Sequence, residues 1–234
     1  QFLIDDVLEA GVSLGSLPQF LELDLGVDLS TALLDEAAKF AGDVISPLRR
    51  VGDVQAATCT DGGVQIPPGY GDAIAKLGAG GWVGISAPQN QGGQGLPEVY
   101  GTAACEMWNG ADMAFALEPF LSTGAALAIA AHGDDHLKNT YLEKIYSGEW
   151  SGTMNLTESG AGSDLGPVKT RAEPEGNYFR IYGQKIYITW GDHNATENII
   201  HLVLARLPES PGGTRGISLF LVPKFLVNDD GSIG

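Results

Sequence analysis

The segment from Leu156 to Gly166 reads LTESGAGSDLG and holds residue types that suit an anion. Its three glycines, Gly160, Gly162 and Gly166, fall within seven residues, so the backbone can turn sharply and approach a ligand closely. Ser163 adds a hydroxyl donor. Successive exposed N–H groups in such a loop form a nest for phosphate or pyrophosphate. The segment therefore predicts a phosphate contact, and an ordinary surface turn is the alternative.

This glycine-rich loop differs from the two best-known phosphate loops. Its third glycine comes one residue later than in the dinucleotide fingerprint G-x-G-x-x-G, and it lies among predicted strands instead of opening a strand–helix unit. It also lacks the Gly-Lys-Ser/Thr of a P-loop. Neither a Rossmann site nor a P-loop site is therefore predicted.

A second segment, Tyr187-Ile188-Thr189, offers an aromatic ring beside a hydroxyl group. In a strand, Tyr187 and Thr189 would share one face. That face would suit a flat heteroaromatic ligand, stacked on the ring and hydrogen-bonded at its edge. The alternative is an ordinary sheet face whose aromatic residue belongs to the core.

Helices are predicted up to about Gly148. From Ser30 to Ser46, apolar residues recur at the spacing of one buried helical face, and Pro47 is expected to end that helix. Three further helices are expected at about 97–108, 120–132 and 137–146.

After residue 148 the pattern changes to short strands. Residues 178–182 and 185–189 are rich in aromatic and β-branched types, and Gly183-Gln184 between them predicts a two-residue hairpin. Two more strands are predicted at 199–206 and 216–222. Helices followed by strands indicate an α+β fold with segregated layers.

Charge and composition exclude several classes of function. The 13 Lys and Arg against 29 Asp and Glu give a formal net charge of −16, which disfavours nucleic-acid binding. No uninterrupted apolar run predicts membrane insertion, and no signal-peptide pattern is present. The two cysteines, Cys59 and Cys105, form neither a disulfide framework nor a metal motif. We expect a cytoplasmic protein in which no residue is assigned to a metal.

The stretch Met154 to Asp164, followed by Gly183 to Thr189, resembles the paired flavin-contact motifs of the acyl-CoA dehydrogenase family. The resemblance covers the whole chain. It implies an N-terminal helical domain at 1–148 and a β-barrel-like middle domain at 149–234. The stretch from Gly191 to Phe225 is similar to the branch that includes 3-methylthiopropanoyl-CoA dehydrogenases.

The resemblance also implies roles for individual residues. Thr157 would place its hydroxyl at the pyrimidine side of the flavin, and Gly162 and Ser163 would face the FAD pyrophosphate. Ser163 would also lie near the acyl-CoA substrate. The residues implied to bind FAD are Met154, Leu156, Thr157, Gly162, Ser163, Tyr187, Ile188 and Thr189.

Three positions depart from the family pattern. Many members have an aromatic residue where Met154 stands and Trp or Phe where Tyr187 stands. Tyr187 would lie against the isoalloxazine ring, and Thr189 would hydrogen-bond near N5. A thioether and a phenol can still pack on a ring. Ser159 replaces the usual proline and loosens the loop.

The implied activity is FAD-dependent α,β-dehydrogenation of an acyl-CoA thioester in fatty acid metabolism, within a homodimer or homotetramer. An electron-transferring flavoprotein would reoxidise the flavin. The family's C-terminal helical bundle, which supplies the catalytic Glu in most members, is not in this sequence, so no catalytic residue is named and this segment alone is expected to be inactive. Glu158 and Asp164 are expected to brace the loop. An acyl-CoA oxidase, a non-catalytic flavin- or acyl-CoA-binding subunit and a ligand-free structural module remain alternatives.

Overall fold

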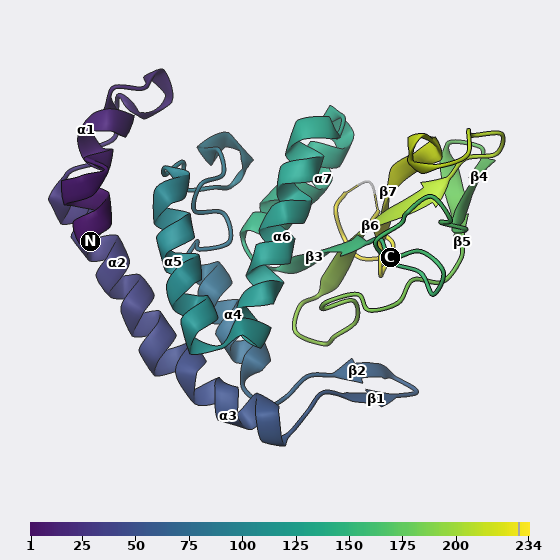
Figure 1. The fold of residues 1–234 in the computed structure, drawn as a ribbon, viewed down its shortest axis with the longest axis horizontal. Coiled ribbons are helices and arrows are strands. Elements are labelled where there is room, and N and C mark those ends of the chain that lie inside the picture. Colours follow the sequence, from purple (N-terminus) through teal and green to yellow (C-terminus); the bar gives the residue numbers. More distant parts are fainter. Residues whose placement is uncertain (229) are drawn as a thin grey trace.

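The computed structural model describes residues 1–228 and 230–234, in which a helical region precedes a sheet region (Figure 1). The prediction of helices followed by strands is therefore confirmed. The α-helices are α1 (Ala10–Gly15), α2 (Val27–Lys39), α3 (Ser46–Val54), α4 (Tyr70–Ala79), α5 (Glu98–Ala111), α6 (Met113–His132) and α7 (Asp135–Tyr146). Short π- or 3-10 segments lie at Leu3–Val7, Pro18–Phe20, Phe40–Ile45, Gln89–Gln91 and Thr214–Gly216.

The expectation that Pro47 ends a helix is wrong. Helices α2 and α3 are joined by the π-helical turn Phe40–Ile45, so helical backbone continues from Val27 to Val54 (Figure 1). Pro47 lies in the first turn of α3. Proline lacks a backbone N–H and cannot donate the usual helical hydrogen bond. The wider π turn before Pro47 leaves room for its ring.

Helix α6 begins seven residues earlier than the sequence predicted, at Met113 instead of Phe120. The Asp112 carboxylate caps it, because Asp112 Oδ1 accepts hydrogen bonds from the amides of Ala114 and Phe115. Pro119 lies inside the helix. An N-cap contributes about 1 kcal/mol and an internal proline costs about 3 kcal/mol, so the packing of α6 on α5, α7 and β3 must supply the difference.

By length and composition alone, α6 could cross a bilayer, since its 20 residues have a mean hydropathy of 1.5 in the most apolar window. The helix is nevertheless not an uninterrupted apolar run, because Glu118, Ser122 and Thr123 lie within it. In the structure α6 packs between α5, α7 and the sheet, and it holds the buried carboxyl of Glu118. These contacts are those of a core helix, and the absence of membrane insertion stays a prediction.

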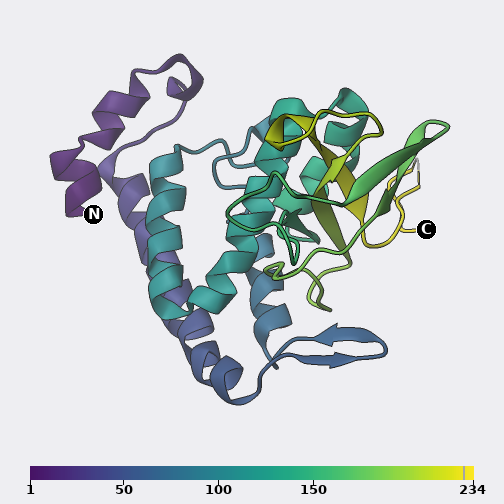
Figure 2. The ribbon, with the colours of Figure 1, turned by 45° about the vertical axis from the view of Figure 1, so that its right-hand side comes forward.

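The sheet region is a five-stranded mixed sheet, and a separate hairpin of β1 (Thr58–Thr60) and β2 (Gly63–Gln65) extends from the helical region (Figures 1 and 2). The central strand β6 pairs in parallel with β3 and β4 and antiparallel with β7, and β4 also pairs with β5. The five strands are β3 (Trp150–Asn155), β4 (Arg171–Glu175), β5 (Tyr178–Tyr182), β6 (Asn198–Arg206) and β7 (Ile217–Pro223).

The predicted hairpin through Gly183-Gln184 is wrong. Strand β5 pairs with the unpredicted β4, whose partner register places Glu175 opposite Tyr178, and residues 185–189 form no strand. The chain passes close to Thr170 at Gly183, where a Cβ would strike that residue. The residues that follow form hydrogen bonds with Leu156 and Thr157 instead of with β5.

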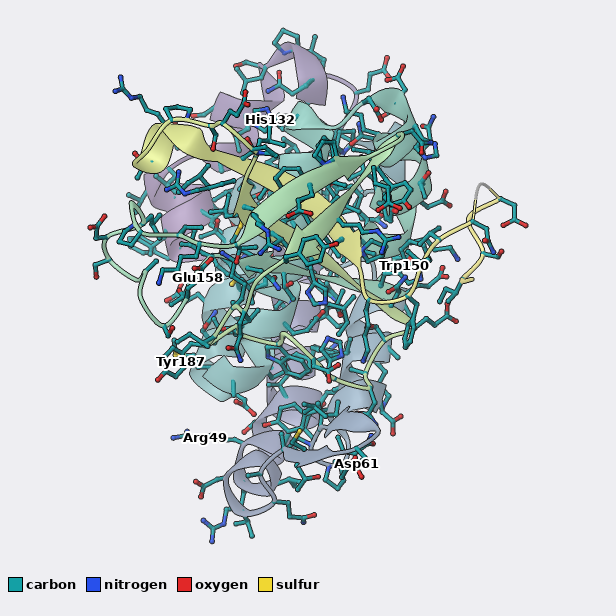
Figure 3. All side chains as sticks on the ribbon, turned by 90° about the vertical axis from the view of Figure 1, so that its right-hand side faces the viewer. Arg49, Asp61, His132, Trp150, Glu158 and Tyr187 are labelled. Atoms are coloured by element: carbon teal, nitrogen blue, oxygen red, sulfur yellow. The ribbon has the colours of Figure 1, made fainter. Side chains whose placement is uncertain are left out.

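Helices α6 and α7 pack against the sheet through a shared core that contains Ala125, Ile129, Ile145, Trp150 and Ile200. At Gly152 a Cβ would lie 2.5 Å from that of Ala125, so glycine lets β3 rest directly on α6. In Figure 3 the sheet lies in front of these helices. This packing determines where β3 delivers Met154 and the loop that follows.

Candidate functional site

The two segments singled out by sequence lie side by side, and the residues that join them are 29 positions apart in the chain. The amide of Ile186 donates a hydrogen bond to the carbonyl of Thr157 at 2.9 Å. The Lys185 ammonium group donates to the carbonyl of Leu156 at 3.0 Å. Glu158 and Tyr187 accordingly lie on the same side of the molecule in Figure 3. The structure thus joins the start of the glycine-rich loop to the Tyr187 segment.

A buried ion pair holds this junction together. Glu158 and Lys185 have side chains that are both 8% exposed, and Lys185 Nζ lies 2.9 Å from Glu158 Oε1. Glu158 also accepts hydrogen bonds from the amides of Lys169 and Thr170 and from the Thr170 hydroxyl. These contacts agree with the bracing role expected for Glu158.

The pKa of Glu158 reflects the same contacts. Burial alone would raise it, but the hydrogen bonds from Thr170, Lys185 and the two amides lower the pKa to about 2. The carboxylate is therefore ionised at neutral pH. A base that weak is poorly matched to proton abstraction near neutral pH.

Beyond Glu158 the glycine-rich loop is open. Gly160, Gly162 and Ser163 are exposed, and a Cβ at either glycine would meet no protein atom within 4 Å. Within the described residues, the amides of these three positions donate no hydrogen bond. Asp164 turns back and accepts from the amide of Gly166 at 2.8 Å. Free, exposed N–H groups on a braced loop fit an anionic group such as pyrophosphate.

The Tyr187 segment is irregular and partly strained. Tyr187 has φ of 57° and is 89% exposed, and Trp190 has φ of 52°. A left-handed backbone is uncommon for aromatic residues and is found at functional sites. Trp190 Nε1 donates to the carbonyl of Ala114 and so attaches the segment to α6. Tyr187 and Thr189 are both exposed, but the strand that was predicted to place them on one face is not formed.

A mostly apolar cavity of about 680 Å³ lies beside this site. It is bounded by α5, α6 and the chain between Trp82 and Ala87, and Met154 at the end of β3 forms part of its wall. The sequence analysis missed this cavity. Small side chains one turn apart on α5, at Gly101 and Cys105, were the available signal.

The predicted site residues therefore divide into groups. Met154 lines the cavity, Leu156 and Thr157 lie at the junction, and Ile188 is half-buried beside it. Gly162 and Ser163 lie on the open loop. No hydrogen bond in the described part of the chain joins that loop tip to Tyr187 or Thr189. Their roles stay predictions.

Comparison with known sequences places this architecture in a family. The chain matches the family model described as acyl-CoA dehydrogenase, N-terminal domain, over residues 28–149, and the corresponding middle domain over 153–231. This protein belongs to the acyl-CoA dehydrogenase family, as its paired motifs predicted.

Two relatives and one solved structure show how far the similarity extends. The chain is 44% identical to a 3-methylmercaptopropionyl-CoA dehydrogenase of Ruegeria pomeroyi, over 97% of this chain and 40% of the relative. It is 37% identical to a butyryl-CoA dehydrogenase of Syntrophomonas wolfei, over 89% of this chain and 35% of the relative. A chain from the structure of the electron transferring flavoprotein of Acidaminococcus fermentans superimposes with a TM-score of 0.71, at 27% identity, over 87% of this chain and 49% of that one. The sequence thus spans less than half the length of these relatives.

Proposed function

We propose that this chain forms the FAD- and acyl-CoA-binding part of an acyl-CoA dehydrogenase. The observation that carries the proposal is the hydrogen-bonded junction between Thr157 and Ile186. It brings a loop suited to pyrophosphate and a segment suited to a flat ring into one site, which neither segment provides alone.

Different residues would bind the pyrophosphate and the flavin ring of FAD. The free amides around Gly162 and the Ser163 hydroxyl would hold the pyrophosphate. The Leu156–Thr157 backbone, the Tyr187 ring and the Thr189 hydroxyl would hold and orient the flavin, with Ile188 behind them. When bound, FAD supplies the acceptor for the hydride that leaves the substrate β-carbon.

The cavity beside Met154 would take the acyl chain. Its lining is mainly apolar, with Trp82, Trp108, Phe120 and Leu127 among the side chains. Such a lining suits the acyl part of a thioester and excludes water from it. The named activities of the two relatives support a short-chain acyl-CoA as substrate.

The proton-abstracting base is proposed to lie outside this sequence. Glu158 is ionised and weakly basic, Asp164 caps its own loop, and Glu118 is buried against hydroxyl groups. We therefore propose that this segment alone is inactive. Reoxidation by an electron-transferring flavoprotein, a homo-oligomeric assembly and a cytoplasmic location belong to the same proposal.

Purification followed by two measurements tests the function. The purified protein should be yellow and contain one FAD for each active site, and the full-length protein should be bleached anaerobically by butyryl-CoA or 3-(methylthio)propanoyl-CoA. Hydrogen peroxide formation during turnover in air would indicate an oxidase instead. A colourless protein that takes up no FAD would overturn the proposal.

A further inference from the structure

Helix α6 carries a carboxyl group deep in the protein, where the helix meets β3. Glu118 is 3% exposed. The hydroxyl oxygens of Ser122 and Ser151 lie 2.8 and 2.7 Å from its Oε1. Its Oε2 is buried as well and has no hydrogen-bond partner among the described residues. This environment holds hydroxyl groups but no compensating positive charge.

The hydrogens available in this network can be counted. Thr196 donates its hydroxyl hydrogen to the carbonyl of Asn198 at 2.9 Å. Ser151 Oγ lies 3.1 Å from Thr196 Oγ1 and 2.7 Å from Glu118 Oε1. These three contacts require three hydrogens, but the two hydroxyl groups supply only two. A protonated Glu118 supplies the third hydrogen by donating to Ser151, which leaves the Ser151 hydrogen for Thr196.

The energetics agree with the count. An ionised carboxylate with a buried, unpartnered oxygen is far more costly than a neutral acid in the same place. Burial raises the pKa of Glu118. In the ionised form the carboxylate would accept hydrogen bonds from Ser151 and Ser122, and these offset only part of that rise.

No charged or titratable neighbour changes this conclusion. In the described part of the chain, none of the ionisable side chains on the surrounding elements forms a hydrogen bond or an ion pair with Glu118. These side chains include Cys105 of α5, Asp112 at the start of α6, Tyr141 and Tyr146 of α7, His193 before β6, and His201 of β6.

We propose that Glu118 carries a proton in the folded protein at neutral pH and, as a neutral donor, positions β3 on α6. Its neighbour Ser122 continues the contact, since the Gly152 amide donates to Ser122 Oγ at 2.9 Å. Strand β3 leads directly to Met154 and Leu156. The consequence for the flavin rests on the function proposed above; the protonation of Glu118 does not.

Infrared difference spectroscopy of the purified protein tests the protonation without any cofactor. The wild-type spectrum minus that of Glu118→Gln should show the carbonyl band of a protonated carboxylic acid at neutral pH. Glu143→Gln, which removes an exposed carboxylate from α7, should give only a carboxylate difference. Absence of the acid band from the first difference would overturn the proposal.

The pH dependence of thermal unfolding provides a second readout. Because the folded pKa of Glu118 lies above the unfolded value of about 4.3, its stabilisation is present below that pH and is lost as the pH rises through the folded pKa. The Tm of wild type should therefore fall relative to that of Glu118→Gln as the pH rises above about 4.3. A Tm difference that is constant or reversed in slope would contradict the proposal.

A third variant covers the case in which Glu118→Gln does not fold. Thr196→Val removes the acceptor of the Ser151 hydrogen, so Ser151 can donate to Glu118 and favour its ionised form. The wild-type acid band should then titrate at a lower pH in Thr196→Val. An unchanged titration midpoint would show that the hydrogen count is wrong.

Discussion

Two buried glutamates, Glu158 and Glu118, have opposite surroundings. Glu158 receives a lysine ammonium, two backbone amides and a hydroxyl. Among the residues that the structure describes, Glu118 has only hydroxyl groups as hydrogen-bond partners, and its Oε2 has none. The pKa of the first is therefore lowered, and that of the second is raised.

This difference shows how one side-chain type serves two structural purposes. An ionised Glu158 can attract a cation from a distant segment, so it joins the glycine-rich loop to residues 185–186. A neutral Glu118 can donate as well as accept, so it fits a network of hydroxyl groups between helix and strand. The available donors, and not the residue type, decide which form is stable.

The largest expected effect comes from removing the cation beside Glu158. Lys185→Met would leave a buried carboxylate unpaired, which costs about 3–5 kcal/mol of folding free energy. We expect that loss in urea unfolding, together with weaker FAD retention because the junction opens. Lys169→Met removes the same charge from an exposed side chain and is the matched control. Equal losses in the two variants would mean that the ion pair contributes nothing.

The second-largest expected effect is the loss of folding stability that protonation of Glu158 causes in acid. The pKa of Glu158 is about 2 in the folded state and about 4.3 when unfolded, so its stabilisation is present above that unfolded value and is lost as the pH falls through the folded one. The full loss is on the order of 3 kcal/mol, and about half of it is expected between neutral pH and about pH 3. Urea unfolding from neutral pH to about pH 3 should show a shallower decline for Glu158→Gln than for wild type. Parallel curves would contradict the assigned ionisation.

A third variant distinguishes the braced base of the loop from its open tip. Gly162→Val should weaken FAD binding by about 1–3 kcal/mol, because the side chain fills the space proposed for the pyrophosphate. Folding should change by at most about 0.5 kcal/mol, since a Cβ there meets no protein atom. FAD content and circular dichroism measure the two effects. Gly212→Val is the control, because a Cβ at Gly212 also meets nothing. Full FAD occupancy in folded Gly162→Val would remove the loop from the site.

The smallest expected effect comes from Thr189, an exposed residue of the Tyr187 segment. Thr189→Val keeps the β-branched shape but removes the hydroxyl proposed near the flavin. Losing one hydrogen bond costs about 0.5–1.5 kcal/mol, so flavin reduction by substrate should slow about three- to tenfold. Stopped-flow absorbance measures the rate and the flavin spectrum together. Thr214→Val, at another exposed threonine, should leave both unchanged. An unaltered spectrum and rate in Thr189→Val would refute the role of this hydroxyl.

Local patterns predicted much of the fold. Helical periodicity located α2, α5 and α7, and β-branched runs located β6 and β7, because each buries one regular face. Strand β3 was missed, since Ser151 and Gly152 have no strong strand preference. They form a strand because β6 and α6 enclose them.

The candidate site was predicted by residue type but not by conformation. Residues 185–189 have the composition of a strand, yet hydrogen bonding to the loop and the left-handed Tyr187 give them another path. Tyr187 and Thr189, which strand alternation would place on one face, are both exposed. The cavity was not predictable from any one segment, because α5, α6 and β3 each contribute a wall.

The sequence by itself determined the order of helices and strands, the glycine-rich loop and the two motifs that identify the family. These features depend on residues close together in the chain. The tertiary structure alone decided that Lys185 reaches Glu158 and that Glu118 meets Ser151 and no cation. A carboxyl group is charged or neutral according to the donors that long-range packing brings within hydrogen-bonding distance, and local sequence does not contain that information.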